Sequence, residues 1–126
     1  MRLVQKGRII MAVVFDWLND TNLVISNVTE TIYSNPASTT TFIPSIFLHN
    51  THTSAVVVTL YCVPDNAGVA GTAGAGNQFF KQSLATLEEY VINDHTLILS
   101  DTADTIQAVA ATDAVVNIFI SGAKLT

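Results

Sequence analysis

Residues 40–63 read TTFIPSIFLHNTHTSAVVVTLYCV and contain two apolar runs separated by a short polar segment. The second run, residues 55–63, is nearly continuous and β-branched, which is typical of a strand buried on both faces. Pro44 cannot donate a ladder hydrogen bond, so it belongs at an edge, a bulge or the start of a strand. Residues 50–54 are rich in turn formers, and we interpret them as a hairpin loop between the runs.

The same pattern continues along the chain and predicts an all-β fold. Turn-forming pairs of Asn, Pro, Asp and Ser recur between short apolar segments, which favours an antiparallel β-sandwich or jelly roll of about eight strands. One short helix near residues 77–90 is compatible with this prediction. The further predicted strands are residues 22–34, 95–99, 104–111 and 114–125.

Residues 77–93, NQFFKQSLATLEEYVIN, are ambiguous. Apolar residues recur at helical spacing from Phe80 to Val91, among good helix formers. The segment also fits two strands, at residues 79–84 and 89–93, with a turn between them. Local propensity slightly favours the helix, and the resemblance described below favours the two strands, which we adopt.

Composition and charge exclude several classes of protein. The chain has 126 residues, of which 49% are hydrophobic and only 12% charged, about half the usual charged share. No segment approaches the ~20 apolar residues that span a bilayer. Residues 11–126 hold ten acidic residues and only two basic ones, a net charge of −8. This body therefore lacks the basic stripe that nucleic acid binding requires.

The basic residues gather at the start of the chain, which suggests a division into two parts. Arg2, Lys6 and Arg8 lie in the first ten residues. We expect residues 1–15 to form an N-terminal arm or first strand, and residues 16–126 to form a single β-sandwich domain.

His49 and His52 are the first candidates for a metal or catalytic site. In an extended chain, residues three apart point to opposite faces, so these two side chains would diverge. His95 is the only other histidine. A metal site needs converging ligands, and we predict none here.

Other chemical motifs are equally weak. Cys62, the only cysteine, lies in an apolar run and is expected to be a small buried hydrophobe. No G-x-S-x-G elbow marks a nucleophilic serine, and the glycine-rich residues 65–77 lack the Lys of a phosphate-binding loop. We therefore predict no catalytic residue, no cofactor and no enzymatic activity.

Phe15 and Trp17 form the most conspicuous aromatic feature outside the predicted strands. Such residues are enriched in the cores of protein interfaces, although plain core packing explains them equally well. The predicted interface consists of these two aromatic residues and the basic residues of the arm, Arg2, Lys6, Arg8, Phe15 and Trp17.

About three-quarters of the chain, residues 30–125, resembles the small β-sandwich virion proteins of tailed bacteriophages. Residues 29–64 are similar to their N-terminal half, a strand, a turn, a strand ending in Asn-Thr and a Val/Thr-rich strand. The second half follows the same order up to the close at Ser121-Gly122. Ala103, where glycine is common, and the long glycine-rich loop are departures from the pattern.

The resemblance implies a structural role without catalysis: a capsid decoration (cement) protein or, alternatively, a component of the neck, tail or fibre. Its implied partners are further copies of the chain, commonly as a homotrimer, and other virion proteins such as the major capsid protein. The implied location is the virion, assembled in the host bacterial cytoplasm. A carbohydrate-binding or receptor-binding jelly roll and a small cupin-like lyase or isomerase are the alternatives from other classes.

Overall fold

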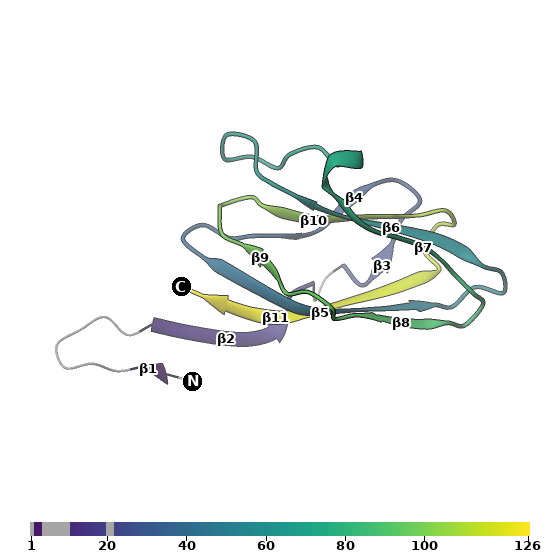
Figure 1. Ribbon diagram of the computed structural model, residues 1–126, viewed down its shortest axis with the longest axis horizontal. Coiled ribbons are helices and arrows are strands. Elements are labelled where there is room, and N and C mark those ends of the chain that lie inside the picture. Colours follow the sequence, from purple (N-terminus) through teal and green to yellow (C-terminus); the bar gives the residue numbers. More distant parts are fainter. Residues whose placement is uncertain (1, 4–10, 20–21) are drawn as a thin grey trace.

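Two antiparallel β-sheets packed face to face make up the protein (Figure 1). The computed structural model describes residues 2–3, 11–19 and 22–126. The larger sheet contains, in spatial order, β1 (Arg2–Leu3), β2 (Met11–Trp17), β11 (Val116–Leu125), β5 (Thr40–Asn50) and β8 (Glu89–Ile92). Two short strands complete this sheet: β3 (Val24–Ile25) pairs with β11, and β9 (Leu97–Leu99) pairs with β5. The smaller sheet contains β4 (Glu30–Ser34), β10 (Thr105–Ala110), β6 (Val56–Val63) and β7 (Gln78–Leu84).

The strands pair in a nested order. β6 pairs with β7, β5 with β8 and β9, β4 with β10, and β2 and β3 with β11. This is the arrangement of one long hairpin rolled up into two sheets, the jelly roll. β2 with β3, and β8 with β9, each act as one interrupted strand, so the rolled part has eight strand positions. The predicted fold class is confirmed.

The core lies between the two sheets and is almost entirely aliphatic. Inward-facing positions alternate with outward-facing ones along β5 and β11, as the pleat of a strand requires. The largest fully buried side chains come from both sheets: Ile25, Ile43, Ile46, Leu48, Leu60, Leu84, Leu99, Ile106, Ile118 and Ile120. None of the helices in the described ranges is long and apolar enough to cross a membrane.

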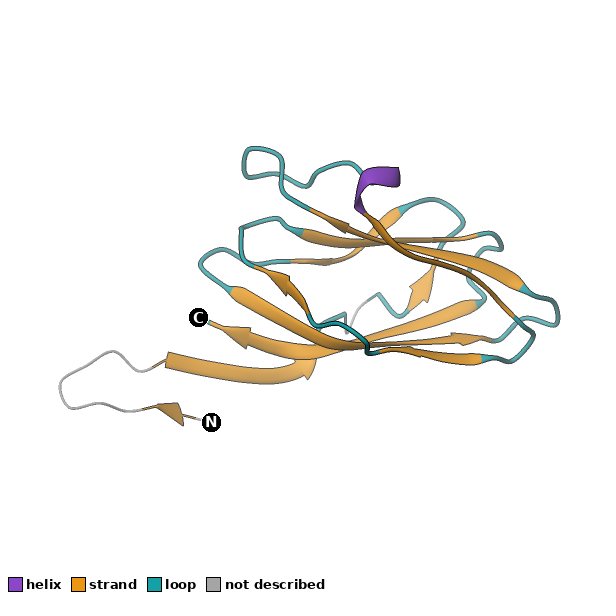
Figure 2. Ribbon diagram, in the orientation of Figure 1, coloured by secondary structure: helices purple, strands orange, loops and turns teal. Residues whose placement is uncertain are grey.

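The ambiguous residues 77–93 form two strands, as we predicted. β7 belongs to the smaller sheet and β8 to the larger, so the turn between them crosses from one sheet to the other. Leu87, at φ +59°, makes the reversal that an uninterrupted helix would not allow. A single-turn 3₁₀ helix at Ala75–Asn77 comes directly before β7 and appears purple in Figure 2.

The predicted hairpin loop at residues 50–54 is wrong. β5 and β6 do not pair with each other, because β5 lies in the larger sheet and β6 in the smaller. The turn is instead an arch between the sheets, held by Asn50, which is fully buried. Its Nδ2 donates to the carbonyl oxygens of Ser54, Leu84 and Ala85, and its Oδ1 accepts from the backbone N–H of His52.

The prediction that residues 55–63 are buried on both faces is only partly right. β6 lies in the middle of its sheet, and Val56, Val58 and Leu60 point into the core. Val57, on the outward face, is 37% exposed. A β-branched run is therefore compatible with one solvated face.

Pro44 lies at a bulge, one of the three places predicted for it. Ser121 pairs with Ser45 and Ala123 with Phe42, so β5 holds one residue more than β11 at this point. On its other side, β5 pairs with β9 up to Ile43 and with β8 from Ile46 onward. The missing N–H of Pro44 therefore falls in a gap between two partner strands and breaks no ladder.

Buried polar side chains fix the opposite end of the sandwich. The Thr41 hydroxyl donates to Asn35 Oδ1 at 2.6 Å, so the Tyr33 hydroxyl must be the donor in its 2.9 Å bond to Thr41 Oγ1. Asn35 Nδ2 in turn donates to the carbonyl oxygens of Thr39 and Asp101. This network ties the turn after β4 to the turn before β10.

Tyr33 makes stability depend on pH in the alkaline range. Burial raises the pKa of its phenol, and the hydrogen bond with Thr41 only partly offsets this. The pKa of Tyr33 in the folded state therefore lies above its unfolded value of 10.0. The contribution of the protonated phenol to folding stability is complete below pH 10, and it is lost as the pH rises through the folded-state pKa. We expect Tyr33→Phe to cost about 1 kcal/mol at neutral pH, through the lost hydrogen bond, and to flatten the alkaline decline. Urea unfolding across this range measures both effects, and an equally steep decline in the variant would contradict them.

Candidate association surface

The outward faces of the two sheets differ in character. The smaller sheet presents polar side chains such as Thr31, Lys81 and Ser83 to solvent, as an antiparallel sandwich usually does. The larger sheet presents aromatic and aliphatic side chains instead. We call this surface the apolar outer face and define it by seven residues that point away from the core: Trp17, Val24, Phe42, Phe47, Val91, Ile98 and Phe119.

Cross-strand pairing brings these residues into contact although they come from six strands. Phe47 of β5 lies opposite Phe119 of β11 on one side and Val91 of β8 on the other. The ring centroids of Phe47 and Phe119 are 6.1 Å apart, and those of Phe119 and Trp17 are 5.7 Å apart with an edge-to-face orientation. Ile98 pairs with Phe42 further along the sheet.

Much of this apolar area is open to solvent. Trp17 is 54% exposed, Ile98 57% and Val91 48%. Scattered exposed hydrophobic residues are normal in soluble domains, but a contiguous patch generally marks a binding surface. The position of these side chains over neighbouring strands makes the apolar outer face such a patch.

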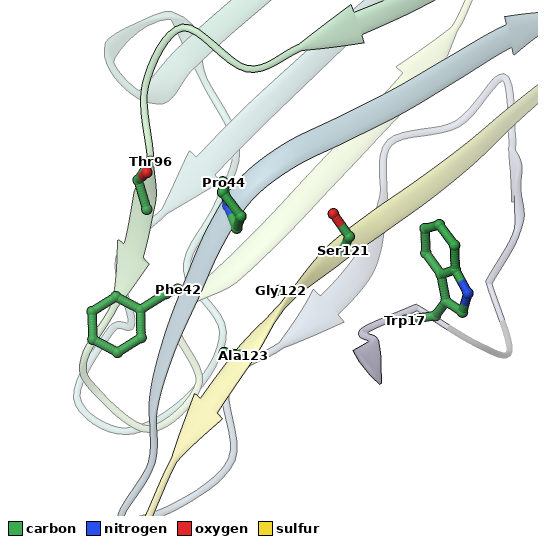
Figure 3. A pocket seen from close by; sticks show the side chains of 7 residues that line it. All are labelled: Trp17, Phe42, Pro44, Thr96, Ser121, Gly122 and Ala123. Carbon is green, nitrogen blue, oxygen red and sulfur yellow. The ribbon is translucent and has the colours of Figure 1, made fainter. Parts of the chain in front are cut away.

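A depression of about 570 Å³ lies within the apolar outer face, at the bulge (Figure 3). Trp17 stands on one side of it, Phe42 and Thr96 stand on the other, and Pro44 lies between them. Its remaining lining comes from β11, as Ser121, Gly122 and Ala123. The small side chain of Ala123 leaves this part of the face low beside the much larger Trp17 and Phe42.

Few charges interrupt the face. Among its described side chains, the register places only His49 and Glu89 as ionisable groups, and they lie opposite each other where β5 meets β8. The other acidic side chains described occupy mainly the turns, as do Asp94, Asp101 and Asp113. The surface therefore carries one acidic side chain, Glu89 at its β5–β8 side, and is much less charged than the rest of the acidic body.

The predicted interface residues fall partly on this surface. Trp17 belongs to it, and Phe15 pairs with Ala123, which lines the depression. Arg2 lies in β1 opposite Ala12, at the outer edge of the larger sheet. Lys6 and Arg8 lie outside the described residues.

The sequence analysis did not predict most of the apolar outer face. The pattern that indicates it is present in β5 and β11, where apolar residues occupy consecutive positions, as in Ile46-Phe47-Leu48 and Ile118-Phe119-Ile120. Consecutive apolar residues in a strand place hydrophobic side chains on both faces. One face forms the core and the other requires a partner or solvent.

The histidines do not gather into a ligand set. His49 lies on β5, His52 in the arch and His95 before β9, and in the described ranges they belong to no group with metal-ligand spacing. Within the part of the chain that the structure describes, the one such group consists of Asp65, Asp101 and Asp104. Asp104 already accepts hydrogen bonds from the backbone N–H groups of Asp65 and Asp101, so its carboxylate acts as a staple between two turns.

Cys62 is half-buried, as a small hydrophobe packed against the core. Burial raises the pKa of its thiol, and the negative charge of Asp104 raises it further. Both effects lower the thiolate fraction at neutral pH, and the thiolate is the reactive form. Its environment therefore favours an inert thiol.

Comparison with known proteins gives only weak likenesses. No family model matches the sequence, and no curated protein matches it. A protein of the Bacillus endospore appendages, which form disulfide-linked pili, is 18% identical with a TM-score of 0.44, over 92% of this chain and 84% of that chain. A protein of the T13 particle of infectious bursal disease virus is 14% identical with a TM-score of 0.42, and a protein of the Gx strain 11% identical with a TM-score of 0.41. This chain spans only 31% and 32% of these two viral proteins. At such TM-scores the likenesses carry no argument about function.

Proposed function

We propose that this protein is a non-enzymatic structural subunit of a bacteriophage virion, in which it acts as a capsid decoration protein. The observation that carries the proposal is the apolar outer face, which leaves Trp17, Val91 and Ile98 about half exposed. Such a surface is costly in an isolated domain and is stabilised when a neighbour covers it. The resemblance of residues 30–125 to small phage virion proteins supports the same role.

A decoration protein works by bridging neighbouring subunits of a shell. Each copy adds buried area across a joint that internal pressure would open. Many weakly bound copies then act together, because the shell holds their binding sites at fixed spacing. A rigid jelly roll with an apolar outer face is suited to this task. A component of the neck, tail or fibre of the virion would need the same two properties.

The N-terminal arm is the second element of the proposal. Among the described strands, β1 pairs only with β2, so this small ribbon extends the edge of the larger sheet. We propose that Arg2, Lys6 and Arg8 lie along an acidic neighbour, joined to it by strand addition. Removal of residues 1–10 is then expected to weaken attachment to the particle at least tenfold, and unchanged attachment would contradict this role.

Particle binding tests the proposed function directly. Particles assembled without this chain are mixed with the purified protein and pelleted, and the bound protein is measured against concentration. We expect saturable binding, together with particles that withstand a higher temperature before releasing their DNA. Protein that stays in the supernatant at every concentration would contradict the proposal.

Carbohydrate binding is a second candidate, favoured by one observation. The half-exposed ring of Trp17 stands beside a depression that also carries the hydroxyl groups of Thr96 and Ser121. An aromatic ring with nearby hydroxyl groups is able to hold a sugar. A glycan array on which the wild-type protein binds and Trp17→Ala does not would favour this candidate over the structural role.

A further inference from the structure

We propose that the apolar outer face binds the same face of a second copy of this chain, related to the first by a two-fold axis. The proposal rests on the proposed function as an assembly subunit and names the partner of its principal surface. A two-fold contact uses the same patch on both copies, so that patch must be complementary to itself. The composition, charge and size of the apolar outer face each fit this requirement.

Charge favours a second copy at this face over any other face. Residues 11–126 carry ten acidic and two basic residues, so most contacts between two copies would bring acidic turns together. The apolar outer face avoids this repulsion, since its described ionisable side chains are His49 and Glu89 alone, at the β5–β8 side. Two surfaces with so few charges need no oppositely charged partner, and a strongly acidic or basic partner would find little here to pair with.

Shape also favours a copy of the same sheet. Two sheets stack about 10 Å apart, with their strands about 30° from parallel, and their facing side chains interdigitate. The rings of Phe47 and Phe119 lie 6.1 Å apart and tilted on this face, and the depression at Trp17, Pro44 and Gly122 lies on the same face. A second copy turned about a two-fold axis would bring its own exposed side chains over this hollow.

The available area fits a reversible dimer. Strands β2, β11, β5 and β8 lie about 4.8 Å apart, and the stretch of β5 from Phe42 to His49 rises about 3.3 Å per residue, which gives a footprint of about 500 Å² per copy. The pair buries about 1,000 Å², the lower limit for a specific interface. We therefore expect a dissociation constant in the micromolar range, which repeated contacts on a particle would reinforce.

Sedimentation equilibrium of the full chain tests the proposal. Val91→Lys and Ile98→Lys place charges on half-exposed positions of the apolar outer face, where the monomer tolerates them. Val57→Lys is the matched control, a valine to lysine change at a partly exposed strand position on the other sheet. We expect the wild type and the control to dimerise in the micromolar range, and each face variant to bind at least tenfold more weakly because it buries an unpaired charge. Circular dichroism confirms that all four proteins are folded.

The possible outcomes separate this inference from the proposed function. A wild-type monomer at every concentration, or a trimer whose mass is unchanged by Val91→Lys, would overturn the two-fold contact. A monomer that still binds particles, and loses that binding in Val91→Lys, would overturn the contact while retaining the structural role. A dimer that Val91→Lys dissociates, without binding to particles, would support the contact and reject the role.

Discussion

Asn50→Ala is expected to lower the free energy of unfolding by about 4 kcal/mol, because it removes all four side-chain hydrogen bonds that this fully buried asparagine makes at the arch. The side-chain amide of Asn50 donates to the carbonyl oxygens of Ser54, Leu84 and Ala85 and so holds the arches after β5 and β7 together. Alanine retains none of these bonds. The expected result is a large drop in the urea midpoint with an unchanged slope.

Asn117→Ala provides the matched control for this prediction. Asn117 lies on β11 opposite His49, half-buried on the outward face of the larger sheet. Its replacement is expected to change the free energy of unfolding by less than about 0.5 kcal/mol. Equal losses for the two variants would show that the buried arch does not depend on Asn50.

Gly122→Val is expected to destabilise the fold by about 3 kcal/mol or more, because the bulge leaves no room for a side chain. A Cβ at this position would overlap the carbonyl oxygen of Phe42 and lie 2.9 Å from Leu18 Cδ1. The backbone of β5 would have to move, and that strand forms the centre of the larger sheet. Thermal unfolding is expected to show a large fall in Tm.

The neighbouring Ala123→Val is the control for Gly122→Val. Ala123 faces the open depression, where extra methyl groups meet solvent instead of backbone. A change of less than about 0.5 kcal/mol is expected. A Gly122→Val variant as stable as the wild type would mean that β5 and β11 are not held in the register described.

The fold could be predicted from the sequence because its strands carry strong local signals. The apolar runs that become β5, β6 and β11, and the turn formers between segments, favour a β-sandwich. The arch at residues 50–54 could not be recognised in the same way. A hairpin loop and an arch between sheets use the same turn-forming residues, and only the partners of the flanking strands distinguish them.

Three buried asparagines illustrate a second limit of the sequence. Asparagine is mostly exposed in folded proteins, yet Asn19, Asn35 and Asn50 are each at most 2% exposed. Asn19 donates from Nδ2 to the carbonyl oxygen of Ile118 and accepts from the N–H of Ile120. It thereby replaces a missing stretch of strand beside β11. Nothing in a local pattern distinguishes such an asparagine from an exposed one.

Of the seven residues that define the apolar outer face, the sequence predicted only Trp17 as an interface residue. Trp17 was predicted together with Phe15 as a conspicuous aromatic feature, whereas Phe47 and Phe119 lie within apolar runs that also supply the core. Because β5 and β11 are central strands, both of their faces can be apolar. The sequence cannot show which face is covered by the second sheet and which is left open.

Fluorescence of Trp17 gives the most direct test of the association surface. The chain contains one tryptophan, which lies on the apolar outer face and is 54% exposed. Its emission is recorded from nanomolar to high micromolar protein, for the wild type and for Val91→Lys. We expect the wild-type emission to shift to shorter wavelength as copies associate and cover the ring, and the emission of Val91→Lys to stay constant over that range. A wild-type spectrum that does not change with concentration, while sedimentation shows association, would mean that the copies meet through another surface and would contradict the account.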